Sequence, residues 1–341
     1  MTAASLIWAQ FAACAAAIGF AGFQLSRYGN VIAYRTGLSG SWIGLTLLAT
    51  VTSLPELATG ITSVTLANSP NLAVGDALGS CVVNLVFLVV IDSFTRDEPV
   101  WRRASHGHVL AGAFGVVLLG FAVVSLLMQQ MPHSGSNPWP GPAALATPIL
   151  LVLYIVAMRT VFAYEQSHPV PVSANDDDGA SLPSLRQALA RFGTAAVVVL
   201  GAGLWLPLVA VELSSIMGWN RSFVGSLFVA IATSLPELAV TLSALRLGAL
   251  DMAIGNLLGS NLFNVAILGV DDLFYRQGSL FADVSVVHAV TAGSAIIMTG
   301  LALIGLFLRP GSRVLRAVGW VSIGLVAIYL LNSYILYLHG D

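Results

Sequence analysis

One seven-residue sequence occurs twice in this chain, and each copy carries a glutamate inside a long apolar segment. Residues 52–58 read TSLPELA, and residues 233–239 repeat them without a change, 181 positions later. The similarity continues into a second element, GDALGS at 75–80 and GNLLGS at 255–260. Further matched pairs are Gly44 with Gly225, Ala49 with Ala230, and Asn84 with Asn264. The chain therefore contains two copies of one structural unit, and its fold must place two related halves against each other.

Ten apolar segments, separated by polar stretches, are long enough to cross a bilayer. A span needs roughly 20 apolar residues. The chain is 57% hydrophobic and 9% charged, whereas soluble domains carry about 25% charged residues. This composition excludes a soluble globular fold, and the net charge of −2 gives no nucleic-acid signature. The predicted spans are 3–26, 40–67, 71–94, 107–130, 142–164, 185–214, 221–247, 250–274, 284–308 and 314–338.

The longest polar interruption, residues 165–184, divides the chain into two halves of five spans. The first half is 1–164 with the repeat motif at 44–84, and the second is 185–341 with its motif at 225–264. Because each half has an odd number of spans, the second copy enters the membrane upside down relative to the first. The predicted fold class is thus an all-α membrane protein of ten helices in two inverted five-helix repeats, an architecture of secondary transporters.

The distribution of arginines predicts the orientation. The 14 basic residues are all arginines, and all but Arg221 and Arg276 lie in or beside the loops that follow odd-numbered spans. Cytoplasmic loops carry the excess of basic residues. We therefore expect an integral protein of a bacterial inner (plasma) membrane, with the 165–184 linker cytoplasmic and both termini extracytoplasmic.

Glu56 and Glu237 lie about sixteen residues into their spans, where a lone carboxylate costs several kcal/mol. Such residues are functional candidates by default, and a purely structural glutamate is a poor explanation for two matched positions. Pro55 and Pro236 precede them and predict a break in each helix, with backbone carbonyls released in the turn before the break. The released carbonyls are expected at Leu48, Ala49 and Val51 and at Val229, Ala230 and Ala232.

Hydroxyl groups add further oxygen ligands beside each glutamate. They belong to Thr52 and Ser53 in the first copy and to Thr233 and Ser234 in the second. Carboxylate, hydroxyl and carbonyl oxygens suit a hard cation such as calcium. The same hydroxyls are also suited to capping the backbone around the proline break, and the two roles are compatible.

The second repeated element carries polar side chains on one helix face. Ser80 and Asn84 are four residues apart, as are Ser260 and Asn264, so each pair shares a face. Close helix packing explains the glycines of this element but explains these side chains less well, and we expect them to face the central site. Asp76 is a third acid near the rim, and it is either a proton-carrying group or an interfacial residue.

Six other titratable residues are assigned to membrane interfaces or left without a role. Asp271 and Asp272 are expected at the outer surface, Glu212 at the extracytoplasmic interface, and His106 and His108 at the cytoplasmic interface, whereas His288 receives no role.

The paired TSLPEL and GxxxGSxxxN elements resemble the α-1 and α-2 repeats of the cation/calcium antiporter superfamily, typified by the sodium/calcium exchangers. The resemblance implies that Glu56 and Glu237 are paired calcium ligands and that the first and sixth helices move as gates. It further implies calcium and sodium ligands at Thr52, Ser53, Thr233, Ser234 and the carbonyls of Ala49 and Ala230, outer sodium ligands at Ser80 and Ser260, and central amides at Asn84 and Asn264.

The sequence departs from the superfamily pattern at two positions. The family usually has asparagine where this chain has Asp76 and Cys81, and the second repeat keeps Asn256 and Asn261. These changes leave the coupling ion and the stoichiometry open.

The resulting functional prediction is exchange of Ca²⁺ for Na⁺ by alternating access. The alternatives are Ca²⁺/H⁺ or Na⁺/H⁺ antiport and, in a different class, a passive cation channel. An enzyme is not expected, because the sequence has neither an HExxH metal pair nor a GxSxG nucleophile turn. The expected partners are inorganic cations and membrane lipid, with no cofactor and no nucleic acid; a monomer is sufficient for transport, and the oligomeric state is open.

Overall fold

The chain forms a bundle of long helices interrupted by short ones. The computed structural model describes residues 3–36, 48–94, 100–104, 107–129, 145–167, 183–246, 250–310 and 318–340. The helices are α1 (Ala3–Thr36), α3 (Ala49–Thr52), α4 (Leu54–Thr65), α5 (Pro70–Phe94), α6 (Val100–Arg103), α7 (Gly107–Gln129), α8 (Ala146–Ser167), α9 (Leu185–Met217), α10 (Arg221–Phe223), the π-helical turn η2 (Val224–Val229), α11 (Ala230–Thr233), α12 (Leu235–Arg246), α13 (Leu250–Phe274), α14 (Leu280–Asp283), α15 (Val287–Leu308) and α16 (Trp320–His339).

Within the described residues, eight helices are long and apolar enough to cross a membrane. A ninth span is formed by Arg221–Thr233 and Leu235–Arg246, which meet at an angle of 41°. The remaining predicted span, 40–67, begins outside the described part of the chain and continues as α3 and α4. The protein is therefore an all-helical membrane protein.

The helix boundaries follow the sequence repeat. α5 and α13 are each 25 residues long, and α13 begins 180 positions after α5. The same spacing relates the short helices α6 and α14, and a spacing of 181 relates α4 to α12, each 12 residues long. One local structure is thus built twice, because both copies have the same small, apolar and helix-breaking residues in the same order.

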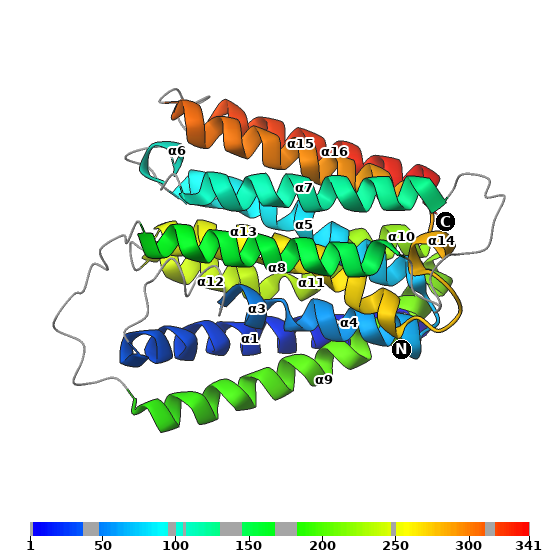
Figure 1. The fold of residues 1–341 in the computed structure, drawn as a ribbon. Helices are drawn as coiled ribbons and strands as arrows, with labels where there is room; N and C mark the ends of the chain where they lie inside the picture. The colour runs from blue at the N-terminus through cyan, green and yellow to red at the C-terminus, as the bar shows by residue number, and fades with distance from the viewer. Residues whose placement is uncertain are drawn as a thin grey trace.

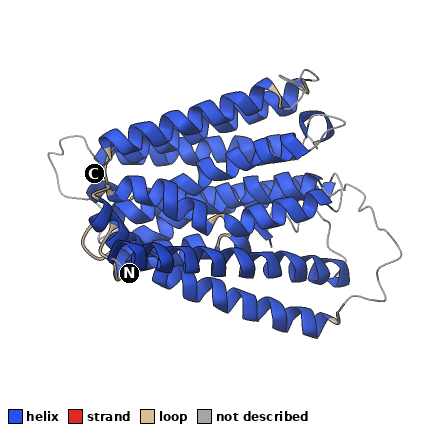
Figure 2. Cartoon of the chain, turned by 180° about the vertical axis from the view of Figure 1, so that it is seen from behind, coloured by secondary structure: helices blue, strands red, loops and turns tan. Residues whose placement is uncertain are grey.

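Helices α5 and α13 form the centre of the bundle. Their most apolar stretches are 83% and 89% buried inside the protein, far more than those of the other spans. Figure 1 shows α1 and α9 along one side of the bundle and α15 and α16 along the opposite side, and the same layers are visible from behind in Figure 2. Polar residues on α5 and α13 are therefore held deep within the protein.

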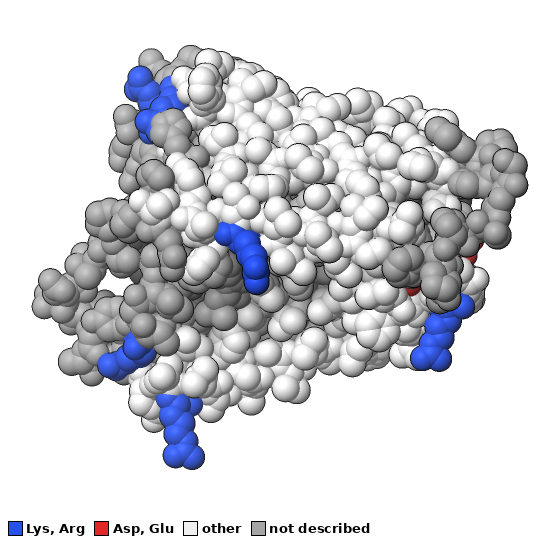
Figure 3. Space-filling model, in the orientation of Figure 1, with Lys and Arg blue, Asp and Glu red and all other residues white. Residues whose placement is uncertain are grey.

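Both termini lie at one end of the bundle (Figure 1). On the face in Figure 3, basic side chains gather mainly toward the other end, and the middle of the surface is almost free of charge. This distribution is the one expected of a protein whose apolar flank contacts lipid.

The two outer helices approach the broken helices at matched glycines. A Cβ atom on Gly22 of α1 would come within 2.5 Å of the Pro236 side chain, and one on Gly203 of α9 would come within 3.2 Å of the Pro55 carbonyl oxygen. Gly22 and Gly203 are 181 positions apart, the spacing of the repeat. Each outer helix therefore packs closely against the break in the opposite half because it has no side chain there.

Candidate cation site

The two breaks place the repeated glutamates at the starts of helices in the protein interior. Glu56 lies in the first turn of α4 and Glu237 in the first turn of α12, with side chains that are 1% and 0% exposed. The N-terminal end of a helix favours a negative charge, because its backbone N–H groups and dipole point toward it. The local fold thus partly offsets the cost of two buried carboxylates.

Each glutamate accepts a hydrogen bond from the other repeat. The Ser234 hydroxyl donates to Glu56 Oε1 at 3.2 Å, and the Ser53 hydroxyl donates to Glu237 Oε1 at 3.0 Å. In the described structure the second oxygen of each carboxylate, Oε2, has no hydrogen-bond partner. The structure therefore brings these four predicted residues together, with one oxygen of each carboxylate available to a cation.

Thr52, Ala49 and Ser260 lie on the Glu237 side of this centre. The Ser260 hydroxyl is 3.2 Å from Glu237 Oε1 and 3.5 Å from the Ala49 carbonyl oxygen. Thr52 Oγ1 lies 3.4 Å from the same carbonyl oxygen and 3.5 Å from the Ser260 hydroxyl. Thr52 also faces Asn256, whose Oδ1 is 3.5 Å from the threonine hydroxyl.

The related arrangement in the other half contains Asp76 in place of Asn256. The Thr233 hydroxyl lies 2.9 Å from Asp76 Oδ1, 3.3 Å from the Ala230 carbonyl oxygen and 3.5 Å from the Ser80 hydroxyl. Asp76 is only 1% exposed, so its carboxylate is enclosed by the protein. The helix α5 carries it inward because its first turns are covered by η2 and α10.

The expected release of the Ala49 and Ala230 carbonyls is also wrong. Ser53 N–H donates to the Ala49 oxygen at 3.1 Å, and Ser234 N–H donates to the Ala230 oxygen at 3.0 Å. A proline removes only its own N–H, so it cannot release a carbonyl whose donor is two residues before it. Both oxygens still have a second lone pair that faces the hydroxyl groups described above.

The predicted amides Asn84 and Asn264 are both buried, but the structure gives them different surroundings. Asn84 Nδ2 donates to Asn261 Oδ1 at 3.1 Å, and Asn261 in turn donates to the Cys81 carbonyl at 3.1 Å. The side-chain oxygen and nitrogen of Asn264 have no partner within the described part of the chain. Asn256 and Asn261 were not predicted as site residues, although their alignment with Asp76 and Cys81 could have indicated them.

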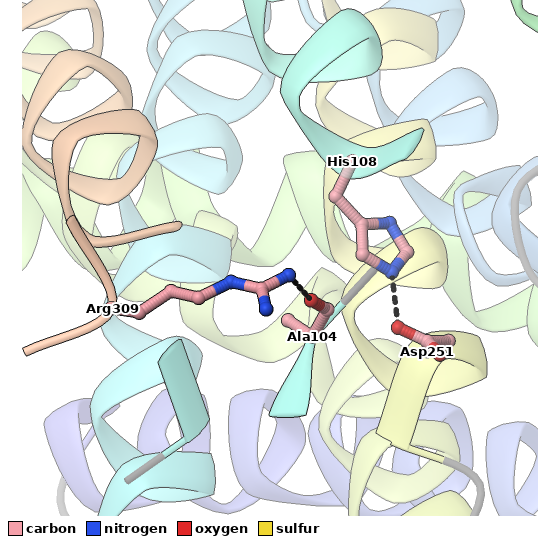
Figure 4. Close-up of polar contacts among 4 residues, drawn as sticks. All are labelled: Ala104, His108, Asp251 and Arg309. Carbon is pink, nitrogen blue, oxygen red and sulfur yellow. Dashed lines mark hydrogen bonds and ion pairs between the residues drawn. The ribbon is translucent and has the colours of Figure 1, made fainter. Parts of the chain in front are cut away.

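Two histidines form matching contacts at opposite ends of the repeat. His108 Nε2 on α7 is 2.9 Å from Asp251 Oδ1 at the start of α13, as Figure 4 shows. His288 Nε2 on α15 is 3.2 Å from Asn71 Oδ1 at the start of α5, and both residues of this pair lie 180 positions from those of the other. His108 is 2% exposed although it lies at the start of α7, and the repeat spacing could have indicated its contact with Asp251.

Asp272 is also buried, which contradicts its predicted position at the outer surface. It accepts hydrogen bonds from the Thr147 hydroxyl at the start of α8 and from the Leu280 N–H at 2.7 Å. Its repeat equivalent, Asp92, accepts from the Gly319 N–H at 2.8 Å and the Ser322 hydroxyl at 2.6 Å at the start of α16. Asp272 thus joins the central helix α13 to the start of α8, and Asp92 joins the central helix α5 to the start of α16.

Asp271 is likewise 0% exposed, contrary to the prediction, whereas Glu212 is exposed as expected. His106 lies outside the described residues.

No group of three or more histidine, cysteine or acidic side chains in the described segments is placed to hold a metal ion. The candidate site instead combines two glutamates with hydroxyl, amide and carbonyl oxygens, a set suited to hard cations.

Comparison with known proteins gives one consistent result. The sequence matches the family described as sodium/calcium exchanger protein over residues 6–163 and 188–338. The putative antiporter CaxA of Alkalimonas amylolytica is 30% identical over 320 residues, 90% of this chain and 91% of that protein. The inner membrane protein YrbG of Escherichia coli is 28% identical over 294 residues, 80% of this chain and 86% of its own.

Two further similarities concern exchangers. The sodium/calcium exchanger MaX1 of Methanosarcina acetivorans is 27% identical over 339 residues, covering 90% of this chain and 92% of that protein. The solved structure of the sodium-calcium exchanger NCX_Mj, soaked with 100 mM Na⁺ and 10 mM Sr²⁺, has a TM-score of 0.63 at 22% identity. This match covers 96% of the present chain and 97% of the other, and it confirms the predicted fold class.

Proposed function

Because the chain belongs to the sodium/calcium exchanger family, whose members are cation antiporters and not enzymes, we propose that it exchanges Ca²⁺ for Na⁺ across the membrane. The proposed location is a bacterial inner membrane, as the name of the Escherichia coli relative says of that protein. The arginine distribution supports a cytoplasmic 165–184 linker and extracytoplasmic termini.

The observation that carries this proposal is the crossed pair of buried glutamates. Glu56 and Glu237 each accept a hydrogen bond from a serine hydroxyl of the opposite repeat. Each also has one carboxylate oxygen without a partner in the described structure. Two carboxylates balance the charge of one divalent cation, and burial makes an unbalanced pair costly. Sodium ions that use the same carboxylates must compete with calcium, and competition couples the two fluxes.

The surrounding oxygens complete the proposed ligand set. The hydroxyls of Thr52, Ser53, Thr233 and Ser234 and the carbonyls of Ala49 and Ala230 are assigned to the calcium and sodium positions, Ser80 and Ser260 to the outer sodium positions, and Asn84 and Asn264 to the central amides. Helices α1 and α9 are assigned as the gates, since they pack over the broken helices of both halves.

Calcium uptake into proteoliposomes tests the proposal. Uptake should follow an imposed outward sodium gradient in the unaltered protein, and Glu56→Gln or Glu237→Gln should lower it at least about 100-fold, because one charge no longer balances the ion. Glu212→Gln is the matched control, since the same change is made at an exposed glutamate and should leave uptake unaltered. Uptake by Glu56→Gln at the rate of the control would refute the shared site, and uptake independent of any gradient would indicate a channel.

A second candidate, proton-coupled antiport, is favoured by Asp76. This residue is buried, its Oδ2 has no partner in the described structure, and it is a third carboxylate in addition to Glu56 and Glu237. One calcium ion would leave one negative charge among three such carboxylates, and a proton on Asp76 would balance it.

Replacement of Asp76 separates the two candidates. Asp76→Asn reproduces the amide that the second repeat has at Asn256. Sodium-driven calcium uptake should persist within about threefold in this variant if sodium is the counter-ion, because an amide can still accept the Thr233 hydroxyl. Uptake driven only by a proton gradient, and lost in Asp76→Asn, would instead establish proton coupling.

A further inference from the structure

Asp271 is a buried carboxylate to which the site described above gives no role. It lies three residues before the end of α13, is 0% exposed, and neither of its oxygens has a hydrogen-bond partner in the described part of the chain. A buried charge without a partner is costly, and in a membrane protein such a residue generally serves an ion or proton pathway.

The repeat shows that packing alone does not require this acid. The position equivalent to Asp271 in α5 is Ile91, which is also 0% exposed, whereas the neighbouring positions are both aspartates, Asp92 and Asp272. An apolar side chain therefore fills the equivalent position in the other half. The carboxylate of Asp271 is a property of one end of the molecule only.

Asp271 lies on a line of polar groups that leads away from the central site. On α13, Asn264 and Asp271 are seven residues apart, two helical turns on one face, and neither side chain has a partner in the described segments. On the adjacent helix α4, Glu56 and Ser63 have the same spacing, and Glu56 Oε2 and the Ser63 hydroxyl are likewise unpartnered there.

The two lines meet at Gly60, which lies between Glu56 and Ser63 on α4. A Cβ atom on Gly60 would overlap the Asp271 carboxylate, so that carboxylate lies directly against the α4 backbone. Asp271 therefore projects between α4 and α13, one turn of α4 beyond Glu56.

We propose that Asp271 is an additional cation-binding residue, an outer position that the transported calcium ion occupies between the Glu56/Glu237 site and the ends of α4 and α13. These are the ends that the arginine distribution assigns to the extracytoplasmic side. The inference rests on the proposed calcium exchange. In an alternating-access cycle, this position contributes to calcium capture from the extracytoplasmic side only.

The test is calcium uptake by the full chain in proteoliposomes, with the half-saturating calcium concentration measured separately for calcium offered on each side. Asp271→Asn should raise the extracytoplasmic value about three- to tenfold, the effect of removing one charged ligand, and leave the cytoplasmic value within about twofold. Asp271→Ala, which removes the carboxylate and adds no atom beside Gly60, should do the same. Asp283→Asn, an exposed acid at the same end of the bundle, is the control and should change neither value.

Gly60→Ala gives an independent measurement, since it keeps every carboxylate but displaces that of Asp271, and it should raise the same extracytoplasmic value. Unchanged values on both sides in the two Asp271 variants, or an equal change on both sides, would overturn the inference while calcium exchange by the unaltered protein remained intact. Absence of calcium exchange by the unaltered protein would overturn this inference and the proposed function together.

Discussion

At the scale of single residues, the site depends on hydroxyl groups that connect the two repeats. Ser53 binds the glutamate of the second repeat, and Ser234 binds that of the first, at nearly equal distances of 3.0 and 3.2 Å. A hydroxyl donor orients each carboxylate, and its other oxygen has no partner among the described residues. The two serines therefore have equivalent positions, although Ser260 also donates to the Glu237 oxygen that Ser53 binds.

This equivalence predicts matched effects of removing either hydroxyl. Ser53→Ala and Ser234→Ala should each weaken calcium binding by about 1.5 to 3 kcal/mol, the usual value of a hydrogen bond to a charged group. Titration calorimetry of the detergent-purified protein measures this directly. Ser125→Ala is the control, because that buried hydroxyl only donates to the Phe121 carbonyl of its own helix. A large effect of one serine and none of the other would contradict the equivalence.

At the scale of helices, Asp92 and Asp272 are the residues that fix the ends of neighbouring segments. Each accepts two hydrogen bonds from groups at the start of another helix or turn. The partners are backbone N–H and hydroxyl groups of residues 8 to 230 positions away in the sequence. Such contacts hold a helix end in place more firmly than an exposed ion pair.

Loss of either aspartate should therefore destabilise the fold without touching the glutamates. Asp272→Ala and Asp92→Ala should each lower the free energy of unfolding by about 3 to 6 kcal/mol, the sum of two charge-assisted hydrogen bonds. The measurement is thermal unfolding in detergent. The exposed Glu212→Ala should change it by less than about 1 kcal/mol. An equal effect of all three substitutions would mean that the buried hydrogen bonds of Asp92 and Asp272 do not contribute to the free energy of unfolding.

Helix positions could be predicted from the sequence more fully than contacts could. The predicted spans 71–94 and 250–274 agree with α5 and α13 within one residue, because long apolar runs set helix length. The sequence places Asp272 at the outer surface, because a polar residue at the end of a span normally reaches water. Its burial results from the start of α8, which is more than 120 positions away in the sequence.

The candidate site shows the same limit. The repeat identified both glutamates and the four neighbouring hydroxyls, and the structure places them together. The pairing of Ser53 with Glu237 could not be predicted, because it depends on how two inverted halves meet. The surroundings of Asn84 were unpredictable for the same reason, since its partner Asn261 belongs to the other half.

At the scale of the whole molecule, the matched glycines of α1 and α9 have a consequence for how such a transporter resets. Gly22 lies against Pro236 and Gly203 lies against Pro55, so each outer helix approaches the break of the other half at a position where it has no side chain. At these two positions no side chain of the outer helix has to pass the proline when the helix slides along it. Because the two contacts are related by the repeat, a shift that opens one end has an equivalent shift, related by a rotation, that opens the other. Two states of similar energy can then be built from one sequence, with the opposite halves exchanging their conformations and the ions themselves selecting between the two.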